Sequence, residues 1–70
     1  MSNTKIEILD ALHATYIAEE KTGVANLNNY LNNAAGIGEH PDIVIEARKL
    51  VEKIGSARAN IELVTSLKQV

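Results

Sequence analysis

One short segment near the middle of the chain, Ala34–Asp42, constrains the fold more than any other. It holds two of the four glycines, the only proline and one of the two histidines among the 70 residues. Gly36 can end a helix, because glycine adopts the left-handed conformation without a steric penalty, and Gly38 is the next candidate for that role. Pro41 fits the first position of a new helix, because its φ is already near the helical value and it has no amide hydrogen to lose. The segment therefore predicts a turn, residues 34–40, between two helices.

The stretch before this turn, residues 5–33, has the apolar spacing of a single amphipathic helix. Thr4 followed by Glu7 is a capping-box pattern at its start. Gly23 is its weak point, because a glycine in a helix interior costs about 1 kcal/mol relative to alanine. The apolar positions nevertheless keep one phase on both sides of Gly23, so we expect the helix to be continuous. These positions are Ile6, Leu9, Leu12, Tyr16, Ile17, Val24, Leu27, Leu31 and Ala34.

The stretch after the turn, residues 41–68, has a more regular pattern. Its apolar residues are separated alternately by four and three positions, which is the heptad repeat of helices that pack as in a coiled coil. The sequence therefore predicts an all-α fold, with residues 1–70 forming one domain, an antiparallel two-helix hairpin. The heptad positions, which we call the second-helix seam, are Ile43, Ala47, Leu50, Ile54, Ala57, Ile61 and Val64.

Chain length makes self-association the leading expectation. A domain of this size buries only about 60% of its unfolded surface and is marginal without a disulfide, a metal or a partner chain. The chain has no cysteine, so a disulfide is excluded. Apolar residues recur on a second face of both helices, although Leu12 belongs to the first stripe as well, and we interpret this second face as the contact face of a homodimeric four-helix bundle. The simpler alternative is scattered surface residues. The face consists of Ile8, Leu12, Ile45 and Leu63.

Small residues also gather in the middle of the second helix. Gly55, Ser56, Ala57 and Ala59 fall within five positions. Another helix could approach the backbone closely there. Considered only as local sequence, the same residues are a weak point of the helix, because glycine and serine are poor helix formers.

Two weak patterns could indicate a bound metal or anion. Asp10, His13 and Glu20 are of the residue types that form carboxylate–histidine sites in helical bundles, but those sites take ligands from several helices, and residues 41–68 contain no histidine. Gly36 and Gly38 precede a helix, as in loops that hold phosphate. No strand comes before them, and acidic residues follow. We therefore expect His13 to pack at the edge of the core and expect neither a metal nor another cofactor.

Basic residues form a weak patch on the second helix. The chain carries a net charge of −2, and Glu46 and Glu52 lie between the cations, as on a solvated helix surface. These basic residues leave a nucleic-acid-associated dimeric regulator as the alternative to a protein–protein interaction module. Because acidic residues lie between them and the net charge is negative, we favour the protein–protein interaction module. We find no nucleophile–base pair and do not expect an enzyme. The patch consists of Arg48, Lys49, Lys53 and Arg58.

The lengths of the apolar runs indicate where in the cell the protein is located. None approaches the roughly 20 residues that cross a bilayer, and the first five residues lack the apolar core of a signal peptide. The sequence therefore predicts a cytoplasmic protein without membrane contact.

The residues around the turn also carry a resemblance. The stretch YLNNAAGIGEHPDIV, Tyr30–Val44, resembles small helical-hairpin proteins of tailed bacteriophages, notably those that infect marine cyanobacteria. It departs from them at Ala34 and Ala35, where an Asn-Pro-Val-like segment is more usual, and the chain also departs at Gly23. The function that we favour is protein–protein interaction, as a small phage or accessory protein in the host cytoplasm that is an assembly part or modulates a host protein. The resemblance itself implies a phage-related hairpin. It implies no catalytic activity.

Overall fold

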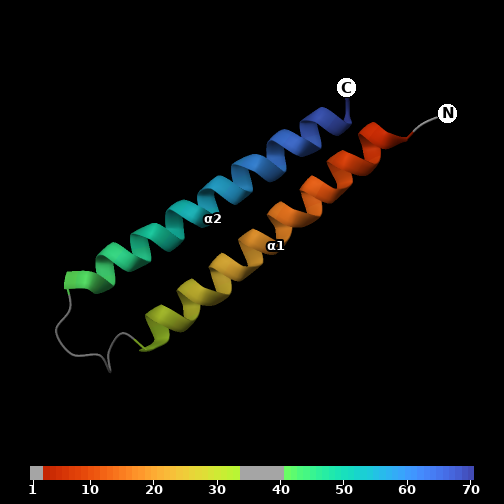
Figure 1. Ribbon diagram of the computed structural model, residues 1–70. Coiled ribbons are helices and arrows are strands. Elements are labelled where there is room, and N and C mark those ends of the chain that lie inside the picture. The colour runs from red at the N-terminus through yellow and green to blue at the C-terminus, as the bar shows by residue number, and fades with distance from the viewer. Residues whose placement is uncertain (1–2, 34–40) are drawn as a thin grey trace.

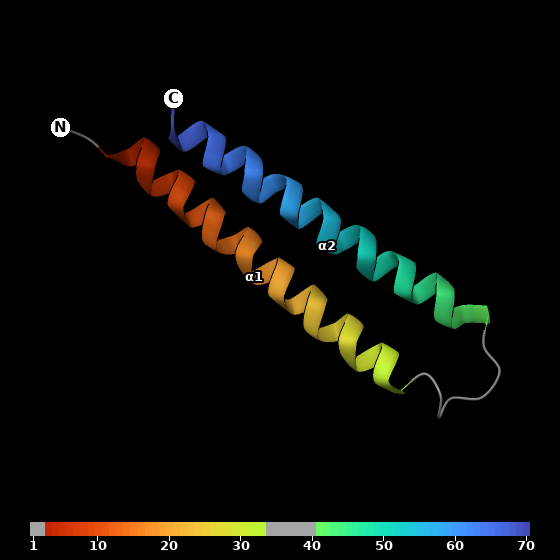
Figure 2. The same ribbon diagram turned by 180° about the vertical axis from the view of Figure 1, so that it is seen from behind.

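Two long helices lie side by side in the computed structural model, which describes residues 3–33 and 41–70 (Figure 1). Helix α1 spans Thr4–Asn33 and helix α2 spans Pro41–Lys68. Those two ranges contain no strand, so the predicted all-α hairpin is confirmed. The two views show the helices running in opposite directions, so that the start of α1 and the end of α2 lie at the same end of a rod measuring 59 × 14 × 12 Å (Figures 1 and 2).

The helix ends lie close to their predicted positions. The amide of Glu7 donates to the Asn3 carbonyl at 2.8 Å. This bond starts α1 at Thr4, one residue earlier than predicted, and puts Asn3 immediately before the helix. Helix α2 begins at Pro41, the residue that the sequence favoured for the first helical position. The predicted roles of Gly36 and Gly38 fall outside the described residues.

Helix α1 is continuous through Gly23, as predicted. Packing explains this continuity, because Gly23 is buried against α2 at the level of Ile54. A Cβ atom added to Gly23 would lie 2.8 Å from Cγ1 of Ile54, which is closer than real Cβ contacts. The residue that weakens α1 locally is therefore the residue that lets α2 approach it.

The interface between the helices forms a thin core. Its buried apolar side chains in the described part of the chain are Leu9 from α1 and Ile54, Ala57 and Val64 from α2. The remaining members of the second-helix seam are half-buried, so this heptad faces α1 as predicted. They are Ile43, Ala47, Leu50 and Ile61.

The inward face of α1 differs from the predicted apolar stripe. Ile6, Leu12 and Leu31 are exposed, although the stripe placed them inside. The positions that do face α2 follow the 4-3 spacing of a heptad, and Ile17 and Val24 are half-buried beside them. Three of these positions carry His13, Glu20 and Gly23, which a hydrophobicity criterion passes over. The α1 positions that face α2, which we call the first-helix seam, are Leu9, His13, Tyr16, Glu20, Gly23, Leu27 and Tyr30.

Candidate interaction surface

The hairpin leaves most of its large aliphatic side chains outside its core. Ten such residues are exposed in the part of the chain that the structure describes, against four buried apolar ones. A two-helix rod can bury only one stripe per helix, so the others remain in contact with water. The exposed residues are Ile6, Ile8, Leu12, Leu31, Val44, Ile45, Val51, Leu63, Leu67 and Val70.

One side of the rod carries an apolar groove between the helices. We call this groove, which α1 and α2 line together, the Val24–Val51 groove. Because Val24 of α1 and Val51 of α2 line the same groove, they lie on the same side of the rod. The groove is lined by Val24, Leu27, Val51, Ile54, Gly55 and Arg58.

Heptad spacing extends the apolar side of this groove. Residues seven apart occupy nearly the same face of a helix. Ile17 and Leu31 lie seven positions before and after Val24, and Val44 lies seven before Val51. A row of apolar residues on each helix therefore continues from the groove towards the end where α1 stops and α2 starts, and Lys21 and Asn28 line an adjoining groove that shares Val24 and Arg58.

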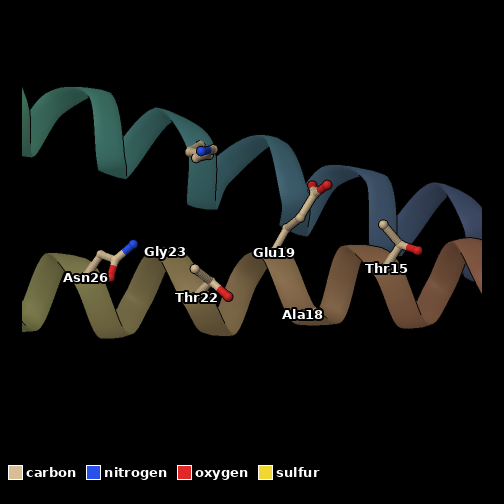
Figure 3. A pocket seen from close by; sticks show the side chains of 7 residues that line it. Thr15, Ala18, Glu19, Thr22, Gly23 and Asn26 are labelled. Carbon is tan, nitrogen blue, oxygen red and sulfur yellow. The ribbon is translucent and has the colours of Figure 1, made fainter.

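The opposite side has a groove of different character. Thr15, Glu19 and Asn26 line it from α1, and Lys53 lines it from α2, together with Ala18, Thr22 and Gly23. Figure 3 shows the polar side chains of Thr15, Glu19, Thr22 and Asn26 spaced along α1 beside α2. We call it the Glu19–Lys53 groove. The middle of this side is polar.

The four residues of the predicted contact face do not lie on one side of the rod. All four of its members are exposed. Ile8 and Leu12 lie seven positions before Thr15 and Glu19, so they share the side of the Glu19–Lys53 groove. Leu67 lies fourteen positions after Lys53, and Leu63 precedes it by one turn, so both belong to the same side. Ile45 is about 200° around α2 from the inward Ile43 and faces away from α1.

Ion pairs join the two helices on the side of the Val24–Val51 groove. Arg58 Nε lies 2.6 Å from Glu20 Oε2, across 38 residues of sequence. Lys68 Nζ lies 2.7 Å from Asp10 Oδ1 near the chain ends. Glu20 is the more enclosed partner of the first pair, with 24% of its side chain exposed against 63% for Arg58. Both pairs form only when α1 and α2 are antiparallel in this register.

The predicted basic patch does not gather into one positive surface. Arg58 is paired with Glu20 on α1. Lys49 Nζ lies 3.2 Å from Glu46 Oε2, and Arg48 Nε lies 4.0 Å from Glu52 Oε2. Lys53 lines the Glu19–Lys53 groove together with an acidic residue. The charges of these cations are therefore largely balanced by neighbouring carboxylates.

The three residues of the weak metal pattern, Asp10, His13 and Glu20, do not come together either. Asp10 pairs with Lys68 and Glu20 with Arg58, while His13 is half-buried between the helices. Asp10 and Glu20 are ten residues apart, or about 15 Å along a helix. Within residues 3–33 and 41–70, no three histidine, cysteine or acidic residues come together as a metal site would need.

Sequence reasoning missed the Val24–Val51 groove as a site. Its signal was present in the seven-residue spacing of Ile17, Val24 and Leu31 and of Val44 and Val51.

Neither described helix has the length and apolarity to cross a membrane. Comparison with models of protein families, with curated proteins and with solved structures gives no match for this chain.

Proposed function

We propose that this protein is a protein–protein interaction or assembly module that works by associating with itself. Its functional form is a homodimer in which two hairpins pack as a four-helix bundle. The observation that carries the proposal is the amount of apolar surface left outside the hairpin core. Ten large aliphatic side chains in the described residues are exposed, and a compact bundle would cover many of them.

Surface area gives the proposal a scale. The chain has a solvent-accessible surface of 5206 Å². A compact monomeric protein of its mass, 7.6 kDa, exposes about 4,300 Å² by the usual scaling with mass. The excess of about 900 Å² is close to the roughly 800 Å² that each partner buries in a standard protein–protein interface. A second copy of the hairpin would supply the missing cover.

The biological setting of the module follows from the resemblance of Tyr30–Val44 to hairpin proteins of tailed bacteriophages. It favours an assembly part or accessory protein in the host cytoplasm, with a phage or host protein as a further partner of the dimer. The pairing of Arg48, Lys49 and Arg58 with carboxylates favours a protein partner over nucleic acid.

The direct test is the mass of the purified protein in solution. Light scattering coupled to size-exclusion chromatography at micromolar concentration should give at least twice the monomer mass of 7.6 kDa. Dilution should lower the mass and the helical circular dichroism together, because a hairpin with so thin a core is marginal without the cover of a second copy. A chain that stays fully helical and monomeric at these concentrations would contradict the proposal.

A further inference from the structure

We infer that the second copy docks on the Val24–Val51 groove and places an aliphatic side chain over Gly55. This inference rests on the proposed self-association and names the surface that it uses. It differs from the contact face predicted from the sequence, three members of which lie on the opposite side of the rod.

Gly55 is the first observation behind this inference. It lies in the middle of α2, where glycine is a poor helix former, and it lines the Val24–Val51 groove. Packing within the hairpin does not require it, because a Cβ atom added there would meet no atom within 4 Å. The missing side chain leaves the groove open towards solvent. An aliphatic group of another chain can enter this space, whereas α1 makes no use of it.

Polarity distinguishes the two sides of the rod. A partner lying along the Glu19–Lys53 groove would remove two charged side chains and several hydroxyl and amide groups from water. Such burial is unfavourable unless each group finds a new partner. A partner lying along the Val24–Val51 groove would mainly cover valine, leucine and isoleucine, and Arg58 there already has its carboxylate at 2.6 Å. An adjoining groove that shares Val24 and Arg58 is lined by Lys21 and Asn28 from α1, and these two side chains can stay in water at the edge of the contact.

Symmetry makes a second copy a suitable occupant. In a two-fold dimer the same patch lies on both subunits, so each copy must supply both a groove and a side chain that fills the partner's groove. Leu31 and Val44 are exposed on the groove side, one heptad away from Val24 and Val51. The surface excess of the whole chain, about 900 Å², is large enough to provide one subunit's share of a standard interface. The face therefore carries both halves of a self-complementary contact.

The experiment compares two exposed aliphatic residues on opposite sides of the rod. Val51 and Leu63 have exposed fractions of 53% and 56%, so neither contributes much to the hairpin core. The dimer dissociation constant is measured by sedimentation equilibrium for the wild type, Val51→Ser and Leu63→Ser. Val51→Ser should raise it at least about tenfold, because each dimer loses two buried valine side chains. Leu63→Ser should change it less than about threefold.

A second matched pair adds bulk instead of removing it. Gly55→Leu fills the Val24–Val51 groove, whereas Ser56→Leu adds the same side chain next to it in sequence, seven positions before Leu63 and on that residue's side. Gly55→Leu should weaken the dimer and Ser56→Leu should not. If Gly55→Leu does not fold, Val51→Ser still decides the question.

The possible failures are distinguishable. A dimeric wild type in which Leu63→Ser has an effect equal to or larger than that of Val51→Ser would overturn the groove and leave self-association in place. Leu63, Leu67, Ile8 and Leu12 would then be the contact. A wild type that is a folded monomer at micromolar concentration would overturn both the groove and the proposed function.

Discussion

Gly23 and Gly55 are glycines in the middle of long helices, on α1 and α2, and both lie next to Ile54. Local sequence treats them alike, since each costs its helix about 1 kcal/mol relative to alanine. Their surroundings are opposite. A side chain at Gly23 would collide with Ile54, whereas one at Gly55 would enter open space. The packing of this hairpin explains Gly23 and does not explain Gly55, so only Gly55 is open to the second copy that we propose.

Ile54→Ala should have the largest effect, because Ile54 is the side chain that fills the space above Gly23. Truncating a buried isoleucine usually costs about 2–5 kcal/mol, which is the lost transfer energy plus the cavity left behind. Small domains have about 5 kcal/mol of stability in total. A urea titration of Ile54→Ala, at the same protein concentration as the wild type, should therefore show a mostly unfolded population already without urea.

Ile45→Ala is the matched control for this substitution. Ile45 is 44% exposed and faces away from α1, so its truncation should lower the free energy of unfolding by less than about 1 kcal/mol. If Ile45→Ala is severe and Ile54→Ala mild, the inward face of α2 has been assigned wrongly.

Gly23→Ala should have an intermediate effect whose sign tests the close approach. Alanine gains about 1 kcal/mol in helix propensity, but overpacking a core costs about 1–3 kcal/mol. We expect a net loss of about 1 kcal/mol in the free energy of unfolding. In an Ile54→Ala background the colliding atom is gone, so Gly23→Ala should become stabilising. Thermal unfolding of the four proteins in this cycle measures the reversal. A stabilising Gly23→Ala in the wild-type background would show that the helices are not in contact there.

The ion pair between Glu20 and Arg58 should have the smallest effect, although it links the surroundings of the two glycines. Glu20 lies one turn before Gly23, and Arg58 lines the groove beside Gly55. Arg58 is mostly exposed, so a double-mutant cycle with Glu20→Gln and Arg58→Gln should give a coupling of about 0.2–1 kcal/mol. The coupling should shrink in 1 M salt, because the Debye length falls to about 3 Å. A coupling that does not respond to salt would indicate an interaction other than the ion pair.

Predictability from sequence differs between the two helices. All seven positions of the second-helix seam are aliphatic, so hydrophobic spacing alone identified the face of α2 that packs on α1. On α1, His13, Glu20 and Gly23 occupy seam positions. A search for apolar residues therefore selected Ile6, Leu12 and Leu31, which the structure places outside. Hydrophobicity identifies a helix face only where the face is hydrophobic.

The candidate surface was predictable only in part. Sequence spacing identified a second apolar face, and its members Ile8, Leu12, Ile45 and Leu63 are exposed, although the apolar stripe of α1 also placed Leu12 inside. It could not tell which of them share a side of the rod, because that depends on how each helix is rotated against the other. The Val24–Val51 groove combines residues from both helices, so it exists only after they pair.

The sequence by itself determined two long helices, a break between them and the inward face of α2. These features depend on helix propensity and on spacing within one segment, which act over a few residues. Only the tertiary structure decided the inward face of α1, the different roles of Gly23 and Gly55 and the pairing of Glu20 with Arg58. These features depend on the antiparallel register, which brings together residues as far apart as 38 positions in sequence. No local pattern specifies a contact over that separation, because its energy comes from the partner helix.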